Sequence, residues 1–111
     1  MKSKAMDWKE EIIESVWQHA RATSEADPSV WRQDMCGAWI RRDHYGHEAS
    51  AFGWKIENVT SGAPSIAQNL RPLHVRNRFD VGGNTAHCQI TADRVNVAAG
   101  EHVNPPRNRS V

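Results

Sequence analysis

The second half of the chain is rich in a side chain that can bind anions. Residues 61–111 contain six arginines, no lysine and only three acidic side chains. A guanidinium presents a planar set of donors that matches two oxygens of a phosphate or a carboxylate. This composition favours an anion-binding surface, although six arginines also fit an ordinary solvated surface. Residues 1–60, with eight basic and ten acidic side chains, show no such excess.

The cysteines and histidines give weaker chemical signals. Cys36 and Cys88 are far apart and neither belongs to a C-x-x-C pair, which excludes zinc sites built from paired cysteines. We expect two free thiols, with no disulfide partner, in a reduced protein. His44, His47 and His74 could act as bases, but a single histidine is more often a solvated or core side chain.

Length and composition limit the architecture that can position these groups. The 111 residues are 24% charged, with a mean hydropathy of -0.70, which fits one small domain. No apolar run approaches the roughly 20 residues of a membrane-spanning helix. The first residues also lack the apolar stretch of a signal peptide. We therefore expect a cytoplasmic protein with no membrane partner.

Hydrophobic periodicity predicts a mixture of helices and strands. Ile13, Val16 and Trp17 recur at helical spacing after a capping Asp7, whereas Trp54 and Ile56 alternate with charged residues. In chain order we expect a helix over 7–22, a helical turn over 30–32, a hairpin of strands over 38–45 and 52–59, a loop over 60–68, a helix over 69–79 and a strand over 86–90. The last residues, 93–111, have too little apolar surface to fold alone and are expected to be flexible.

Four short patterns occur in order along the middle of the chain: Asp34-x-x-Gly37-Ala38, Tyr45-Gly46, Gly53-Trp54-x-Ile56 and Asn69-Leu70-x-Pro72-Leu73-His74. Together with the predicted order strand, strand, loop, helix, they resemble the HNH endonuclease family. The resemblance implies an α+β fold, a small ββα-metal (HNH-like) domain with an N-terminal helical extension. It divides the chain into an extension over 1–33, an HNH-like core over 34–92 and a tail over 93–111.

The resemblance also implies where a nuclease site would lie, and this chain departs from the family there. The family uses a histidine as general base, a preceding aspartate as metal ligand and a second ligand from the helix. The corresponding residues here are Asn58, Glu57 and Arg78. Asn58 cannot accept a proton near neutral pH, and Arg78 puts a permanent cation where a ligand should face the metal. We therefore expect no intact catalytic residue, no bound metal and no cofactor.

An HNH-like scaffold with a dismantled site predicts a catalytically inactive binding protein. Its partner would be a nucleic acid or a protein of a nuclease or defence system, as for an inhibitor encoded by a phage. The expected binding residues are Lys55, Arg71, His74, Arg76 and Arg78. The residues expected to maintain the motif are Trp54, Asn69 and Pro72.

Two other functions remain open at this point. The chain could be an active endonuclease with an unusual site, in which Glu57 holds Mg²⁺ or Mn²⁺ and one of His44, His47 or His74 replaces the missing base. It could also be a structural subunit of a larger phage or mobile-element particle. The sequence does not separate this last function from the binding protein.

Overall fold

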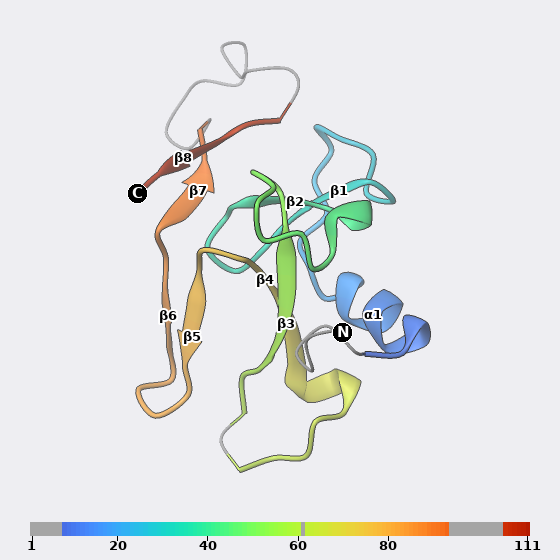
Figure 1. The fold of residues 1–111 in the computed structure, drawn as a ribbon, viewed down its shortest axis with the longest axis vertical. Helices are drawn as coiled ribbons and strands as arrows, with labels where there is room; N and C mark the ends of the chain where they lie inside the picture. Colours follow the sequence, from blue (N-terminus) through green and yellow to red (C-terminus); the bar gives the residue numbers. More distant parts are fainter. Residues whose placement is uncertain (1–7, 61, 94–105) are drawn as a thin grey trace.

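The computed structural model describes residues 8–60, 62–93 and 106–111, and it has an α+β fold (Figure 1). Within these residues, one N-terminal helix is followed by four two-stranded antiparallel hairpins. In chain order the elements are α1 (Glu10–Trp17), β1 (Trp31–Gln33), β2 (Trp39–Arg41), the 3₁₀ turn η2 (Arg42–His44), β3 (Trp54–Asn58), the 3₁₀ turn η3 (Ala67–Asn69), β4 (Leu70–His74), β5 (Arg78–Asp80), β6 (Thr85–His87), β7 (Ile90–Ala92) and β8 (Asn108–Ser110).

The predicted N-terminal helix is confirmed but shorter than expected. Helix α1 ends at Trp17 because Arg21 exchanges two backbone hydrogen bonds with Gln33, of 2.8 and 2.9 Å, and so joins the edge of β1. Arg32 donates to the carbonyls of Gln18 and Ala20, which would otherwise lack partners at the end of the helix. The predicted cap, Asp7, lies outside the described residues.

The core forms where α1 packs against the β3–β4 hairpin. Trp17 and Trp54 are fully buried and their ring centroids are 5.3 Å apart. Trp8 is half-buried against the same cluster. The alternation predicted for β3 is confirmed, since Trp54 and Ile56 are buried and the two charged residues between and after them are only half-buried. In the view of Figure 1, the β5–β6 and β7–β8 hairpins lie on the opposite side of β3–β4 from α1.

Three predicted local structures are wrong. Residues 69–79 do not form a helix: residues 70–74 form β4, which pairs along its whole length with β3, and residues 78–80 form β5. The strand over 52–59 therefore pairs with β4, and the earlier strand, β2, pairs with β1. The helical turn over 30–32 is only a turn after Asp27, because Trp31 begins β1.

The expectation of free thiols is also wrong. Cys36 and Cys88 form an intrachain disulfide, with their Cα atoms 5.6 Å apart. The two cysteines are 52 positions apart in sequence, so only the tertiary fold brings them together. The bond ties the turn between β1 and β2 to the segment between β6 and β7.

The end of the predicted flexible tail is ordered where the structure describes it. Residues 94–105 lie outside the described residues, but β8 pairs with β7. The Asn108 side chain also bonds the backbone N–H of Trp39 at 2.7 Å and the Trp39 carbonyl at 2.9 Å. The final strand is thus anchored to β2 as well as to β7. Within the described segments, no helix combines the length and the apolar character that crossing a membrane requires.

Candidate functional site

Asn58, which the resemblance to the HNH family would place where a general base acts, holds a loop in the structure. Its amide nitrogen donates to the carbonyl oxygens of Ala63 at 3.1 Å and Pro64 at 3.3 Å, and its oxygen accepts the N–H of Thr60 at 2.9 Å. Asn69, expected to maintain the motif, donates to the same Pro64 oxygen at 2.9 Å. Both polar ends of the Asn58 amide are therefore occupied by the loop that follows β3.

Glu57 is also engaged within the protein. One carboxylate oxygen accepts the backbone N–H of Phe79 at 3.1 Å, and the other lies 3.3 Å from the ammonium of Lys55. Arg78 directly precedes Phe79 at the start of β5 and is exposed to solvent. The fold thus brings β5 to Glu57, although it does so with a strand where we expected a helix. Among the described residues, no three His, Cys, Asp or Glu side chains are grouped as a metal site would require.

His74, expected to bind a partner, is buried in the structure with 2% of its surface exposed. Its Nε2 lies 2.8 Å from the carbonyl of Ala51, and its Nδ1 accepts the backbone N–H of Arg76 at 3.1 Å. These partners require a neutral ring with the proton on Nε2. Burial lowers the pKa of His74, which favours the same neutral state.

The histidines that could replace the missing base lie near the other end of the β3–β4 ladder. His74 pairs with Trp54, whereas Asn58 pairs with Leu70 at the opposite end. His44 lies 2.6 Å from the hydroxyl of Ser50, and its ring is 5.5 Å from that of His47. The register therefore separates His74 from Asn58, and the bridge between Tyr45 and Trp54 keeps the segment of His44 and His47 at the Trp54 end of the ladder.

Three cations of the described residues line two hollows that share Arg76, and we call this set the cationic ridge: Lys55, Arg76 and Arg109. Arg76 is exposed and lies between two shallow hollows of about 380 and 310 Å³. Lys55 lines the first hollow with Glu48, and Arg109 lines the second with Ser110. The sequence predicted Lys55 and Arg76 as binding residues but missed Arg109, because only the tertiary contacts of β8 with β7 and β2 bring it to this place.

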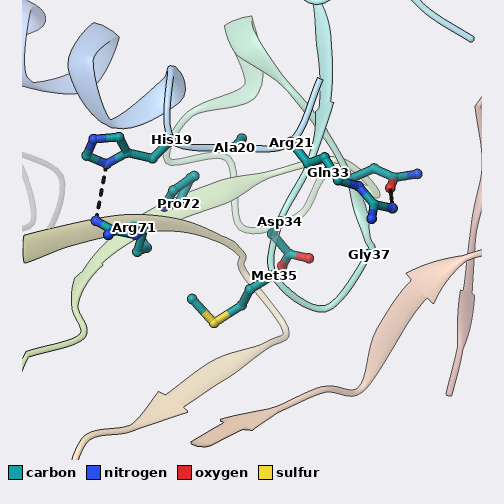
Figure 2. Close-up of a pocket in the computed structure, with 9 residues that line it drawn as sticks. All are labelled: His19, Ala20, Arg21, Gln33, Asp34, Met35, Gly37, Arg71 and Pro72. Carbon is teal, nitrogen blue, oxygen red and sulfur yellow. Dashed lines mark hydrogen bonds between the residues drawn. The ribbon is translucent and has the colours of Figure 1, made fainter. Parts of the chain in front are cut away.

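The remaining predicted binding residue, Arg71, lies away from the ridge in a pocket of about 250 Å³ (Figure 2). Three segments form this pocket, namely the turn after α1, the turn between β1 and β2, and the first half of β4, which includes Pro72. Figure 2 shows His19 and Arg71 on one side and Arg21 with Gln33 on the other. The sequence missed His19 and Arg21, since only the tertiary fold places them near Arg71.

Comparison with known proteins gives no relative for this arrangement: no family model, no curated protein and no solved structure matches the chain.

Proposed function

We propose that this protein binds the phosphate groups of a nucleic acid and does not cleave it. The likeness to the ββα-metal fold is part of this proposal. It is supported by the β3–β4 hairpin, which places the G-W-x-I pattern opposite the N-L-x-P-L-H pattern, with Ile56 paired to Pro72. The helix of such a fold is absent from residues 70–80, where two strands stand instead.

The observation that carries the proposal is the state of Asn58. A general base needs a free lone pair within hydrogen-bond reach of the attacking water. The Asn58 oxygen accepts the N–H of Thr60, and its nitrogen donates to two loop carbonyls. An amide is also not a base near neutral pH. The position serves the structure of the loop, which argues against hydrolysis by a base at this position.

The cationic ridge supplies the binding surface in this proposal. Arg76 and Arg109 are exposed, and a guanidinium can bond two phosphate oxygens at once. The backbone of Arg76 is fixed because its N–H bonds the buried His74 ring, so its side chain leaves the surface from a defined point. Lys55 contributes less, because Glu57 partly neutralises it at 3.3 Å. The disulfide favours an oxidising compartment over the cytoplasm as the place where the protein acts.

Fluorescence anisotropy with a dye-labelled oligonucleotide duplex tests the binding. Each phosphate contact contributes a slope of about -0.9 to the logarithm of affinity against the logarithm of salt concentration. We expect the substitution Arg76→Gln to weaken binding and to reduce that slope by roughly 1. Arg107→Gln is the matched control, since the Arg107 guanidinium is engaged with Asp93 at 3.4 Å. Absence of binding in low salt, or equal losses in both variants, would contradict the proposal.

A nuclease assay tests the second half of the proposal. Purified protein is incubated with plasmid and Mg²⁺ or Mn²⁺, beside the variant Glu57→Ala. We expect the plasmid to stay intact with both proteins. Metal-dependent nicking by the wild type that Glu57→Ala abolishes would show instead that the site is catalytic.

A further inference from the structure

The β5–β6 hairpin contributes less to the core than the other hairpins of the described residues. No residue of β5 or β6 is buried, whereas each of the other three hairpins contains buried residues. A two-stranded hairpin without a buried face gains little stability by itself. Figure 1 shows this hairpin along one edge of the molecule, with its turn at the outer end. Its side chains are therefore open to a partner.

The base of this hairpin is held firmly by the rest of the protein. Asn77, directly before β5, is fully buried, and its amide makes three hydrogen bonds of 2.8 to 3.1 Å with the backbone of the segment that follows β6. Cys88, directly after β6, is bonded to Cys36. The N–H of Phe79 donates to the carboxylate of Glu57 at 3.1 Å. The hairpin thus projects from a fixed base, which lowers the entropic cost of binding through it.

One face of the hairpin is polar. Arg78 lies opposite His87, and Asp80 lies opposite Thr85. Residues directly opposite each other, and alternate residues of one strand, point to the same face of a sheet. These four side chains therefore share one face, and Arg78, His87 and Thr85 are exposed. Phe79 belongs to the opposite face and is half-buried.

Arg78 gives the polar face a free positive charge. Its guanidinium has no hydrogen bond or ion pair with any residue that the structure describes. The Asp80 carboxylate is instead engaged within the hairpin, where one oxygen accepts the N–H of Gly83 at 3.2 Å and the other lies 3.7 Å from Nε2 of His87. Arg76 of the cationic ridge is also exposed and lies two positions before Arg78. The polar face therefore presents an arginine beside the ridge.

We propose that the β5–β6 hairpin enters the major groove of double-stranded DNA and that Arg78 bonds a base edge there. The major groove is about 12 Å wide and admits a two-stranded β-ribbon, whose strands are about 4.8 Å apart. An arginine in this groove can donate two hydrogen bonds to O6 and N7 of a guanine. The deep, narrow major groove of an RNA helix does not admit side chains in this way. The inference rests on the proposed function for the binding of nucleic acid, and it adds the form of nucleic acid and the groove.

Selection from a random duplex library tests this reading, followed by anisotropy with the enriched duplex and with a scrambled duplex of the same composition. We expect the wild type to bind the enriched duplex about tenfold more tightly, the effect of one good arginine–guanine pair. Arg78→Gln should remove most of this preference. Arg76→Gln should weaken both duplexes by a similar factor, because a phosphate contact does not depend on sequence. Arg107→Gln is again the matched control and should change neither affinity.

Replacement of guanine by 7-deazaguanine tests the groove with the wild-type protein. This base lacks the N7 acceptor, which lies in the major groove. We expect its introduction at the enriched guanines to weaken binding by the wild type several-fold and to leave binding by Arg78→Gln unaffected. No loss with the wild type would overturn the major-groove contact. Because β5 has no buried residue, Arg78→Gln should unfold at the same urea concentration as the wild type.

The outcomes separate this inference from the proposed function. Equal affinity for all duplexes, or tighter binding of a single strand than of the duplex, would overturn the role of the hairpin and leave nucleic-acid binding standing. A preference for the enriched duplex that survives Arg78→Gln would also overturn it. If neither single strands nor duplexes bind in low salt, the proposed function and this inference both fail.

Discussion

Replacement of Asp34 by asparagine tests whether this buried carboxylate organises the fold. Its Oδ1 accepts the backbone N–H groups of Cys36 and Ala38, and its Oδ2 accepts the N–H of His74 and the Asn77 amide. An asparagine has the same shape but only one acceptor oxygen. Whichever way its amide turns, two of the four donors lose their acceptor.

The cost can be estimated from these two lost bonds. A buried donor left without a partner costs about 1 to 3 kcal/mol, so the two lost bonds of Asp34→Asn should lower the free energy of unfolding by about 2 to 6 kcal/mol. That is a large share of the roughly 5 to 15 kcal/mol typical of a small domain. The variant should still fold, because the disulfide holds the same turn.

Urea denaturation followed by tryptophan fluorescence measures this change. The chain has five tryptophans, and Trp17, Trp39 and Trp54 are fully buried, so unfolding exposes strong reporters to water. Asp43→Asn makes the same chemical change at a carboxylate with 66% of its side chain exposed, where the loss should stay below about 1 kcal/mol. A loss of less than about 0.5 kcal/mol for Asp34→Asn would refute the role assigned to the carboxylate.

Two further predictions concern the disulfide and the buried histidine. Closing a loop between cysteines 52 positions apart stabilises a fold by about 4 kcal/mol in the chain-entropy treatment. We therefore expect urea denaturation to show that the double variant Cys36→Ala, Cys88→Ala has lost most of this stabilisation. An unchanged midpoint of unfolding would contradict the prediction. The pKa of His74 is lowered by burial from its ordinary value of 6.5, so the unfolded chain binds a proton that the folded protein does not. The contribution of the neutral His74 to stability is therefore full above about pH 6.5 and is lost as the pH falls below that value. His74→Gln should reduce the dependence of the free energy of unfolding on pH between pH 7 and 5.

Local patterns in the sequence identified the elements that have a regular apolar face. Val16 and Trp17 lie on the apolar face of a confirmed helix, and Trp54 and Ile56 on the buried face of a confirmed strand. In each case a periodic apolar face is enough, because any core will bury it. The loop before η3 was likewise indicated by its Gly and Pro residues.

The segment 69–79 shows why other elements could not be predicted. Leu73 and Val75 fit a short helix as well as they fit a strand, and the residues themselves do not decide. Pairing with β3 selects the strand, because each residue of β3 from Trp54 to Asn58 pairs with a residue of β4. Pro72 is tolerated in β4 because, in the described part of the chain, this strand has only one neighbour.

In the candidate site, too, some features follow from the sequence and others only from the tertiary structure. The sequence alone determined that Asn58 cannot act as a base and that the second half of the chain is rich in arginine, because both follow from residue identity. Only the tertiary structure decided that His74 is buried, that Cys36 meets Cys88 and that Arg21 and Arg71 line one pocket. These facts depend on contacts between distant segments, whose formation reflects the packing of the whole chain and leaves no local pattern in the sequence.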